Sequence, residues 1–206
     1  MLKIWGRITS INVQKVVWCA DELGLAYERI DVGGTFGGTR TPEYLAMNPN
    51  SYVPTIEEDG FTLYESNAIV RYFAARDGAA RLWPRDPKAR ADVDRWMEWQ
   101  SNTFTPAMRD AFWQLIRTPQ ADRDAAATEK SVAASERLAV ILDGQLSRNE
   151  YLTPNGFTAA DLVVGCSAHR WLNLPIERPR LANLERWYAL LKSRPASRQV
   201  TSQKLS

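Results

Sequence analysis

Apolar and polar residues alternate at the start of the chain in a way that predicts short strands separated by helices. Residues 2–5 read Leu-Lys-Ile-Trp, which is typical of a strand, and the apolar residues after the next polar turn recur at helical spacing until Gly24. A second strand is predicted over residues 27–32. The glycine-rich stretch 33–38 then predicts a mobile loop.

The pattern continues with a helix, a hairpin and a further helix. Residues 42–47 follow a threonine and begin with a proline, which favours a short helix. Residues 53–57 and 61–64 have strand patterns on either side of an Asp-Gly turn and predict a β-hairpin. Ser66 is predicted to cap the next helix, and Gly78 is predicted to end it.

Strand patterns disappear after this point, and long helical periods take their place. The predicted helical segments are 88–117, 128–146, 159–171 and 181–192. We therefore expect an α/β domain with the order βαβαββα over residues 1–78, a linker over 79–87 and an all-α domain over 88–206.

Composition and charge exclude several classes of protein. With 206 residues, 45% apolar residues and a formal net charge of +2, the chain has an ordinary globular composition and lacks the basic stripe that nucleic-acid binding needs. It has neither a run of apolar residues long enough to cross a membrane nor a signal-peptide pattern at its start, which predicts a cytoplasmic protein. Cys19 and Cys166 lie far apart in the sequence and neither belongs to a CxxC pair, so neither a disulfide scaffold nor a zinc site is indicated, and His169, the single histidine, adds no support for a metal site.

Pro54 is unusual because a proline cannot donate a hydrogen bond to a strand ladder. It belongs at an edge, at the first position of a strand, or in a turn with a cis peptide bond. In the cis alternative the N–H and C=O of Val53 would face outward and could pair with a peptide-like ligand. The alternative is an edge-strand proline with no ligand, and the residues themselves leave both of these alternatives open.

Glu65 and Ser66 form an acidic and hydroxyl pair at a predicted helix start. The N–H groups at a helix N-terminus can bind a carboxylate, and the neighbouring Glu65 could bind an ammonium group. The pair could therefore hold both charged groups of an α-amino acid. The alternative is that Ser66 is simply a helix cap.

A polar turn joins the first strand to the first helix and contains Thr9, Ser10 and Asn12. No histidine lies nearby in the sequence to activate a serine nucleophile. A hydroxyl that donates a hydrogen bond to a bound thiolate is the better chemical interpretation, because it favours the charged form of the sulfur. Helix capping by Ser10 or Asn12 is the alternative.

These motifs together resemble the cytosolic glutathione transferases, in particular bacterial, serine-type, theta-like members. The resemblance covers essentially the whole chain. The segments that carry it, in family order and spacing, are Ser10-x-Asn12-Val13-Gln14-Lys15-Val16, Asn48-Pro49-x-x-x-Val53-Pro54, Glu65-Ser66-Asn67-Ala68-Ile69 and Phe157-Thr158-Ala159-Ala160-Asp161. The resemblance implies a thioredoxin-like first domain, an all-helical second domain, a homodimer, and glutathione as co-substrate with no metal or redox cofactor.

The resemblance also implies a role for each motif in binding glutathione. The backbone of Val53, ahead of a cis Pro54, would bind the cysteinyl part, and Glu65 and Ser66 would bind the γ-glutamyl end. Ser10 falls where serine-type members place the hydroxyl that stabilises the thiolate, with Asn12 in reserve. Members of the cysteine and tyrosine types carry those residues in this region, and this chain does not.

Two parts of the expected site are less well defined by the motifs. Tyr52 stands where family members often have a basic or amide residue, so we expect Arg40 to bind the glycyl carboxylate. In the family the second substrate is bound by the helical region, where an aromatic-rich stretch also reads as ordinary core. Our candidates for an electrophile pocket are Met108, Arg109, Phe112 and Trp113.

Thr158 and Asp161 have the spacing of a capping box ahead of an apolar helix. We expect this pair to serve folding and not catalysis.

The predicted function is transfer of the glutathione thiolate to a hydrophobic electrophile, as in detoxification. A glutathione-dependent isomerase, dehalogenase or peroxidase would use the same thiolate. A non-catalytic glutathione carrier or protein interaction module of the same fold is the alternative from another class.

Overall fold

The computed structural model describes residues 1–77 and 80–206. Gly78, the predicted end of a helix, lies outside the described residues, and so does the first residue of the predicted linker at 79–87. The described residues fall into two compact units, which are considered separately below.

Unit 1 comprises Met1–Trp83 together with Pro195–Gln203, and unit 2 comprises Pro84–Arg194 and Lys204–Ser206. The predicted helical domain over 88–206 includes the segment Pro195–Gln203, which the prediction therefore groups with unit 2. The structure groups this segment with unit 1, where α10 (Arg198–Thr201) contacts α1 (Ile11–Leu23).

One side chain fastens the C-terminal segment to unit 1. Gln199 Nε2 donates to Asp21 Oδ2 over 3.0 Å and to the hydroxyl of Tyr27 over 3.1 Å. A contact between residues so far apart in the sequence leaves no local pattern. Helical periodicity therefore predicted only that Pro195–Gln203 follows the other helices of the 88–206 domain.

The sheet of unit 1 has four strands in the order β2-β1-β3-β4. β1 (Leu2–Trp5) pairs in parallel with β2 (Tyr27–Ile30) and antiparallel with β3 (Thr55–Glu58), and β3 pairs antiparallel with β4 (Phe61–Tyr64). The predicted strand at 53–57 begins later than expected, at Thr55, because Pro54 has no N–H to donate to the ladder.

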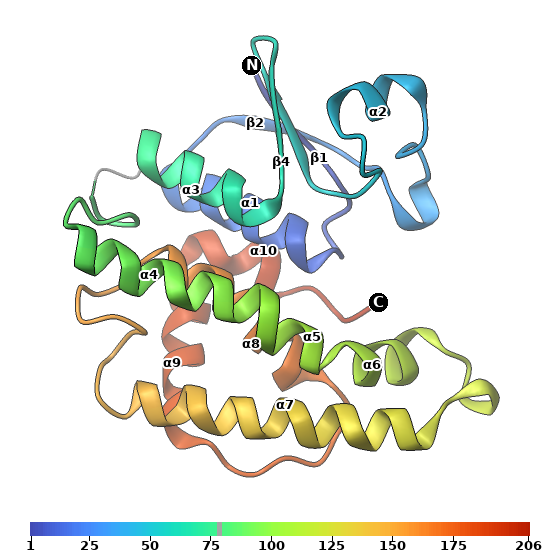
Figure 1. Cartoon of the computed structure of the whole chain (residues 1–206), viewed down its shortest axis with the longest axis vertical. Coiled ribbons are helices and arrows are strands. Elements are labelled where there is room, and N and C mark those ends of the chain that lie inside the picture. Colours follow the sequence, from blue (N-terminus) through green and yellow to red (C-terminus); the bar gives the residue numbers. More distant parts are fainter. Residues whose placement is uncertain (78–79) are drawn as a thin grey trace. The chain divides into compact units, whose positions relative to one another are not determined.

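Three α-helices and a short 3₁₀ turn complete the order βαβαββα, which confirms the predicted thioredoxin-like domain (Figure 1). These elements are α1, η1 (Gly34–Phe36), α2 (Pro42–Met47) and α3 (Ser66–Arg76). α1 and α3 pack against each other. The glycine-rich loop is therefore not entirely irregular, since η1 lies within it.

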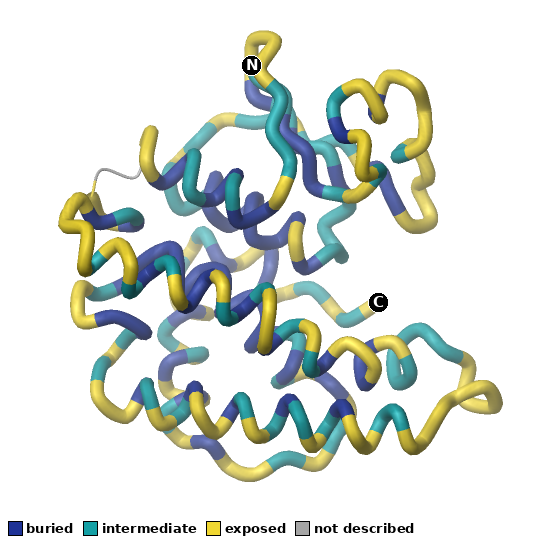
Figure 2. The backbone as a smooth tube through the Cα atoms, in the orientation of Figure 1, coloured by how far each residue is buried: buried dark blue, intermediate teal, exposed yellow. Residues whose placement is uncertain are grey.

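α1 is buried along most of its length, as its dark colour in Figure 2 shows. Val13, Val16 and Val17 have no exposed surface, and they belong to the apolar set that predicted the helix. Gly24 follows the helix with a left-handed backbone (φ 68°) and ends it where the sequence predicts.

Unit 2 is helical, as predicted. Its α-helices are α4 (Pro87–Trp99), α5 (Thr105–Ala107), α6 (Arg109–Phe112), α7 (Ala125–Leu146), α8 (Ala159–Asn173) and α9 (Ala182–Ser193). Its shorter helical elements are η2 (Gln100–Phe104), η3 (Trp113–Arg117) and η4 (Gln120–Asp122). The turn η5 (Pro195–Ser197) belongs to the segment grouped with unit 1. No helix in the described parts of the chain is long and apolar enough to cross a membrane.

The predicted continuous helix over 88–117 is broken into shorter pieces. η2 and η3 are π-helical, and the backbone at Met108 leaves the helical region (φ −91°, ψ 2°). Pro106 lies between η2 and Met108 and cannot donate the hydrogen bond that a regular helix requires. The apolar period continues through this region even though the helical hydrogen bonding changes, so periodicity did not reveal the break.

Asp161 is completely buried and organises the start of α8. Its carboxylate accepts the backbone N–H groups of Leu152 and Thr158 and the indole N–H of Trp187, each over 2.9 Å, and also the hydroxyl of Thr158 over 3.2 Å. Burial raises the pKa of Asp161 to about 6 although the four hydrogen bonds act in the opposite direction. Through these four hydrogen bonds the carboxyl group joins three segments of unit 2.

We predict that Asp161→Ala lowers the free energy of unfolding by roughly 3–5 kcal/mol, because several buried donors lose their acceptor at once. Urea denaturation measures this change. Asp124 is the matched control, since it caps α7 on the surface by accepting the N–H of Ala127 over 2.9 Å. Asp124→Ala should cost only about 1 kcal/mol. Equal losses in the two variants would contradict the structural role of Asp161.

Candidate functional site

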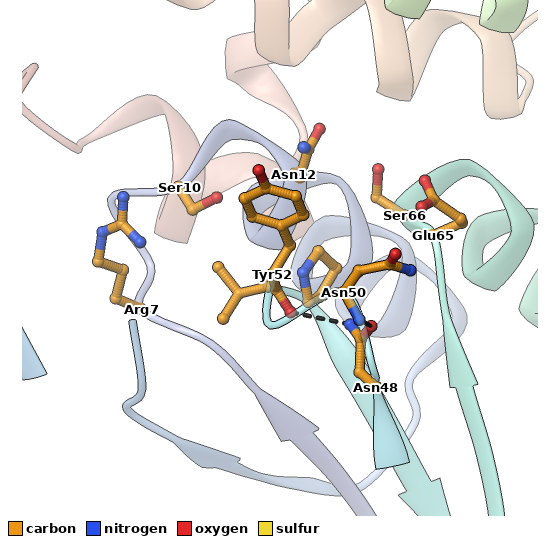
Figure 3. A pocket seen from close by; sticks show the side chains of 10 residues that line it. Arg7, Ser10, Asn12, Asn48, Asn50, Tyr52, Glu65 and Ser66 are labelled. Atoms are coloured by element: carbon orange, nitrogen blue, oxygen red, sulfur yellow. Dashed lines mark hydrogen bonds between the residues drawn. The ribbon is translucent and has the colours of Figure 1, made fainter. Parts of the chain in front are cut away.

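A pocket of about 270 Å³ lies in unit 1, where three separate segments of the chain meet (Figure 3). The segments are the turn between β1 and α1, the loop ahead of β3 and the start of α3. The residues that line the pocket are Arg7, Ser10, Asn12, Asn48, Asn50, Tyr52, Val53, Pro54, Glu65 and Ser66. Six predicted site residues therefore share one cavity, although up to 56 positions separate Ser10 from Ser66 in the sequence.

Buried hydrogen bonds hold the loop ahead of β3 in place. The carbonyl of Tyr52 accepts the amide N–H of Asn48 over 2.9 Å and the hydroxyl of Tyr44 over 2.7 Å. Asn48 Nδ2 and the Tyr44 hydroxyl also bond Thr55 Oγ1, over 3.1 and 2.9 Å. Both ends of the short stretch containing Val53 are thereby anchored.

The Val53–Pro54 peptide bond is cis, as the resemblance implies. The edge-strand explanation of Pro54 does not apply, because β3 lies inside the sheet between β1 and β4. Among the hydrogen bonds of residues 1–77 and 80–206, none uses the backbone N–H or C=O of Val53. This backbone lines the pocket and can pair with an extended ligand.

Gly6 lets the β1–α1 turn approach this loop. A Cβ atom at Gly6 would lie 2.4 Å from Val13 Cγ2 and 3.2 Å from Val53 Cβ, and the backbone has φ 152°. Any side chain here would push the turn away from Val53. The glycine therefore allows the turn that carries Ser10 to sit beside the loop that carries Val53.

Ser10 occupies the N-cap position of α1 but does not act as a cap. Its carbonyl accepts the N–H of Gln14 over 2.9 Å, which begins the helix. Its side chain makes no capping hydrogen bond within the described parts of the chain. The capping alternative for Ser10 is thus not realised, and Figure 3 shows its hydroxyl directed into the pocket.

The neighbouring polar residues differ in position. Asn12 also lines the pocket and is exposed. Thr9 does not belong to the lining set.

Glu65 and Ser66 enter the pocket from α3. The helix begins at Ser66, so Glu65 and not Ser66 occupies the N-cap position. Glu65 has φ 71°, a left-handed backbone that is uncommon for a residue with a side chain and costs about 1–3 kcal/mol. Strain of this kind tends to be kept at functional sites, and here it directs the carboxylate and the first helical N–H groups toward the same cavity.

Ser66 is linked to α1 by a buried lysine. Lys15 is only 2% exposed, and its Nζ donates to Ser66 Oγ over 3.4 Å and to Asn67 Oδ1 over 3.2 Å. A positive charge beneath the N-terminus of α3 adds to the partial positive charge of the helix end. This side of the pocket is therefore suited to a carboxylate.

The sequence reasoning missed four lining residues: Arg7, Asn48, Asn50 and Tyr52. Asn48 is a structural residue of the loop, and Tyr52 is 77% exposed. A signal for Arg7 was present, because it lies three positions before Ser10 in the same turn. Arg40, our candidate for the glycyl carboxylate, is exposed and is absent from the lining set.

The candidates for the electrophile pocket all lie in unit 2 and divide into two kinds. Met108 and Phe112 are buried, and Phe112 packs with Ala111 and Leu174 in a core cluster. Arg109 and Trp113 are exposed.

Neither cysteine is placed for thiol chemistry. Cys19 and Cys166 are both free and buried, and burial raises the pKa of the Cys19 thiol far above its ordinary value. His169 Nδ1 lies 2.6 Å from the hydroxyl of Tyr188. In the described ranges, no group of three or more His, Cys, Asp or Glu side chains could hold a metal ion.

Comparisons with known proteins agree with this arrangement. Residues 9–76 match the family model described as "Glutathione S-transferase, N-terminal domain". Glutathione S-transferase GstB of Escherichia coli (strain K12) is 39% identical over 202 residues, which cover 97% of each chain. Glutathione S-transferase F14 of Arabidopsis thaliana is 32% identical over 94% of this chain and 78% of its own.

A solved structure gives the same result for the whole chain. The theta class glutathione S-transferase of Xanthomonas axonopodis pv. citri, with glutathione bound, superimposes with a TM-score of 0.95 and 45% identity. The match covers 100% of this chain and 99% of the other. The chain therefore belongs to the glutathione S-transferase family.

Proposed function

We propose that the unit 1 pocket binds glutathione and that Ser10 activates its thiol for attack on an electrophilic carbon. The observation that carries this proposal is the convergence of an uncapped hydroxyl, a free backbone peptide and a carboxylate beside a helix N-terminus in one cavity. The relatives of this chain are named as glutathione S-transferases, and a structure similar to it has glutathione bound. Both findings support the proposal further.

The γ-glutamyl end of glutathione carries an ammonium group and a carboxylate. Glu65 is the acidic side chain of the pocket and pairs with the ammonium. The N–H groups at the start of α3 and the hydroxyl of Ser66 receive the carboxylate, with Lys15 supplying charge from beneath. The two ligand charges thus meet complementary groups on adjacent residues.

The cysteinyl residue lies along Val53, whose free N–H and C=O form two strand-like hydrogen bonds with it. This pairing places the sulfur toward the β1–α1 turn. The thiol releases its proton to solvent, and the Ser10 hydroxyl donates a hydrogen bond to the resulting thiolate. The thiolate then forms a bond to the electrophilic carbon. Ser10 keeps its own proton throughout.

The remaining parts of the proposal rest on the family. We propose that Met108, Arg109, Phe112 and Trp113 bind the electrophile, that the protein is a cytoplasmic homodimer, and that no metal or redox cofactor takes part. Arg40 is still proposed as a partner of the glycyl carboxylate, from its position in the sequence.

Ser10→Ala should abolish most thiolate formation at pH 7, because the bound thiol returns toward a pKa of about 8.5 when the hydrogen bond is lost. Ultraviolet absorbance of the thiolate, followed during glutathione titration, measures this change. Asn12→Ala is the matched comparison. If Asn12→Ala loses the thiolate and Ser10→Ala keeps it, the activating role belongs to Asn12. Saturable binding to the wild-type protein without thiolate would favour the carrier alternative.

Glu65→Gln and Ser66→Ala should weaken glutathione binding by roughly 10- to 100-fold, since each removes a charge-assisted interaction. The pKa of the bound thiol should stay unchanged in both variants. Calorimetry with glutathione and with cysteinylglycine, which lacks the γ-glutamyl group, shows whether the lost affinity belongs to that group. The wild-type protein should bind glutathione more tightly than cysteinylglycine, and this difference in affinity should largely disappear in both variants. A difference equal to that of the wild-type protein would rule out Glu65 and Ser66 as the partners of the γ-glutamyl group.

Arg109→Ala should lower kcat/KM for electrophiles that carry a negative charge by about fivefold or more and leave neutral electrophiles unaffected. Steady-state kinetics with matched acidic and neutral substrates measure the difference. Arg148 is an exposed arginine in the same unit and provides the control, as Arg148→Ala removes the same charge. Unchanged kinetics with both substrate types in Arg109→Ala would remove this residue from the proposal.

A further inference from the structure

The lining of the pocket contains two charged side chains, and the proposed function uses one of them. Glu65 comes from the start of α3, and Arg7 comes from the turn after β1. Figure 3 shows them on opposite sides of the cavity, with Arg7 beside Ser10. The cavity therefore has a negative side and a positive side, and the positive side has no assigned ligand group.

The glycine-rich loop holds the guanidinium group of Arg7 in place. A Cβ atom at Gly34 would lie 2.9 Å from Arg7 Nε, and one at Gly33 would lie 3.2 Å from Arg7 Nη1. Both glycines also have positive φ, at 59° and 82°. The loop backbone thus packs directly against the guanidinium group, in a way that side chains at these positions would prevent.

The side chain of Arg7 has no acceptor among the residues that the structure describes. No hydrogen bond or ion pair of its side chain occurs in residues 1–77 and 80–206, although it is only partly exposed. Arg29, close to it in the fold, differs because it donates to the carbonyl of Gly6 and to Asp31. A guanidinium group that lines a pocket and has no protein acceptor keeps its N–H donors available for an anionic ligand. The pocket itself offers the place for that anion.

Bound glutathione offers the sulfur and the glycyl carboxylate as remaining anionic groups, once the γ-glutamyl carboxylate is bound by α3. Arg7 and Ser10 belong to one tight turn, in which the N–H of Ser10 donates to the carbonyl of Arg7 over 3.1 Å. Their side chains line the same cavity and lie side by side in Figure 3, so we expect a ligand group that reaches the Ser10 hydroxyl to approach the guanidinium group as well. The sulfur is the group that the proposed function places there.

We propose that Arg7 is a second catalytic residue, whose guanidinium charge acts with the Ser10 hydroxyl to stabilise the thiolate of bound glutathione. This inference rests on the proposed function, because it requires glutathione in this pocket with its sulfur at Ser10. The S–H bond breaks, the proton leaves to solvent, and the electron pair stays on sulfur. Arg7 takes no part in the proton transfer and acts through its charge.

The test is a pH titration of thiolate absorbance with glutathione bound to wild-type protein, Arg7→Met and Arg7→Lys. An opposite charge within about 4–6 Å lowers a pKa by one unit or more, so Arg7→Met should raise the pKa of the bound thiol by at least about one unit. Arg7→Lys should give a smaller rise, because it keeps the charge but not the planar group. Arg198→Met removes an exposed arginine of unit 1 outside the pocket and should leave the pKa unchanged.

A second ligand distinguishes whether Arg7 acts on the sulfur or on the glycyl carboxylate. S-methylglutathione keeps all the carboxylates but has no ionisable thiol, so its affinity should differ between wild-type protein and Arg7→Met by no more than about twofold. A large loss of S-methylglutathione affinity with an unchanged thiol pKa would overturn the proposal and assign Arg7 to the carboxylate.

Two further outcomes keep this inference distinct from the proposed function. Absence of thiolate in the wild-type protein would overturn the proposed role of Ser10 and that of Arg7 with it. Normal wild-type thiolate with no pKa change in Arg7→Met would overturn the role of Arg7 alone. Gly34→Ala provides an independent variant that keeps the charge but displaces the guanidinium group, and it should also raise the pKa of the bound thiol.

Discussion

The two hydrogen bonds accepted by the carbonyl of Tyr52 are the constraint on which the pocket depends. They come from Asn48 and Tyr44, and both donors also bond Thr55 at the start of β3. The stretch between these anchors is too short to move independently, so the backbone of Val53 is held at the surface of the cavity. A loop without these buried bonds could satisfy its polar groups within the protein and would lose the free peptide that a ligand needs.

The starts of two helices converge on this fixed loop. α1 brings Ser10 and α3 brings Glu65 and Ser66, while Lys15 joins the two helices from below. The N-termini of helices attract negative charge, so a ligand with several anionic groups gains from both ends at once. The left-handed backbone of Glu65 places an acidic side chain of the lining at the same point, where it can select a ligand that also carries an ammonium group.

Two acidic residues show how burial and partners decide the role of a side chain. Asp161 in unit 2 is fully buried and uses its oxygens on four internal donors, so nothing is left for a ligand. Glu65 in unit 1 is exposed and faces a cavity. Both residues stand at the beginning of a helix, Glu65 at the N-cap position of α3 and Asp161 in the first turn of α8. They differ because the fold surrounds Asp161 with hydrogen-bond donors and leaves Glu65 beside a cavity.

The sequence by itself determined the order of strands and helices in unit 1, the helical nature of unit 2 and most of the lining of the pocket. Those features follow from local periodicity, from turn and cap residues, and from motifs whose spacing is specific when taken together. The tertiary structure decided the rest. The grouping of Pro195–Gln203 with unit 1 and the placement of Arg7 against Gly33 and Gly34 depend on contacts between residues distant in the chain. Such contacts leave no local pattern, because each partner is compatible with many other neighbours until the chain folds.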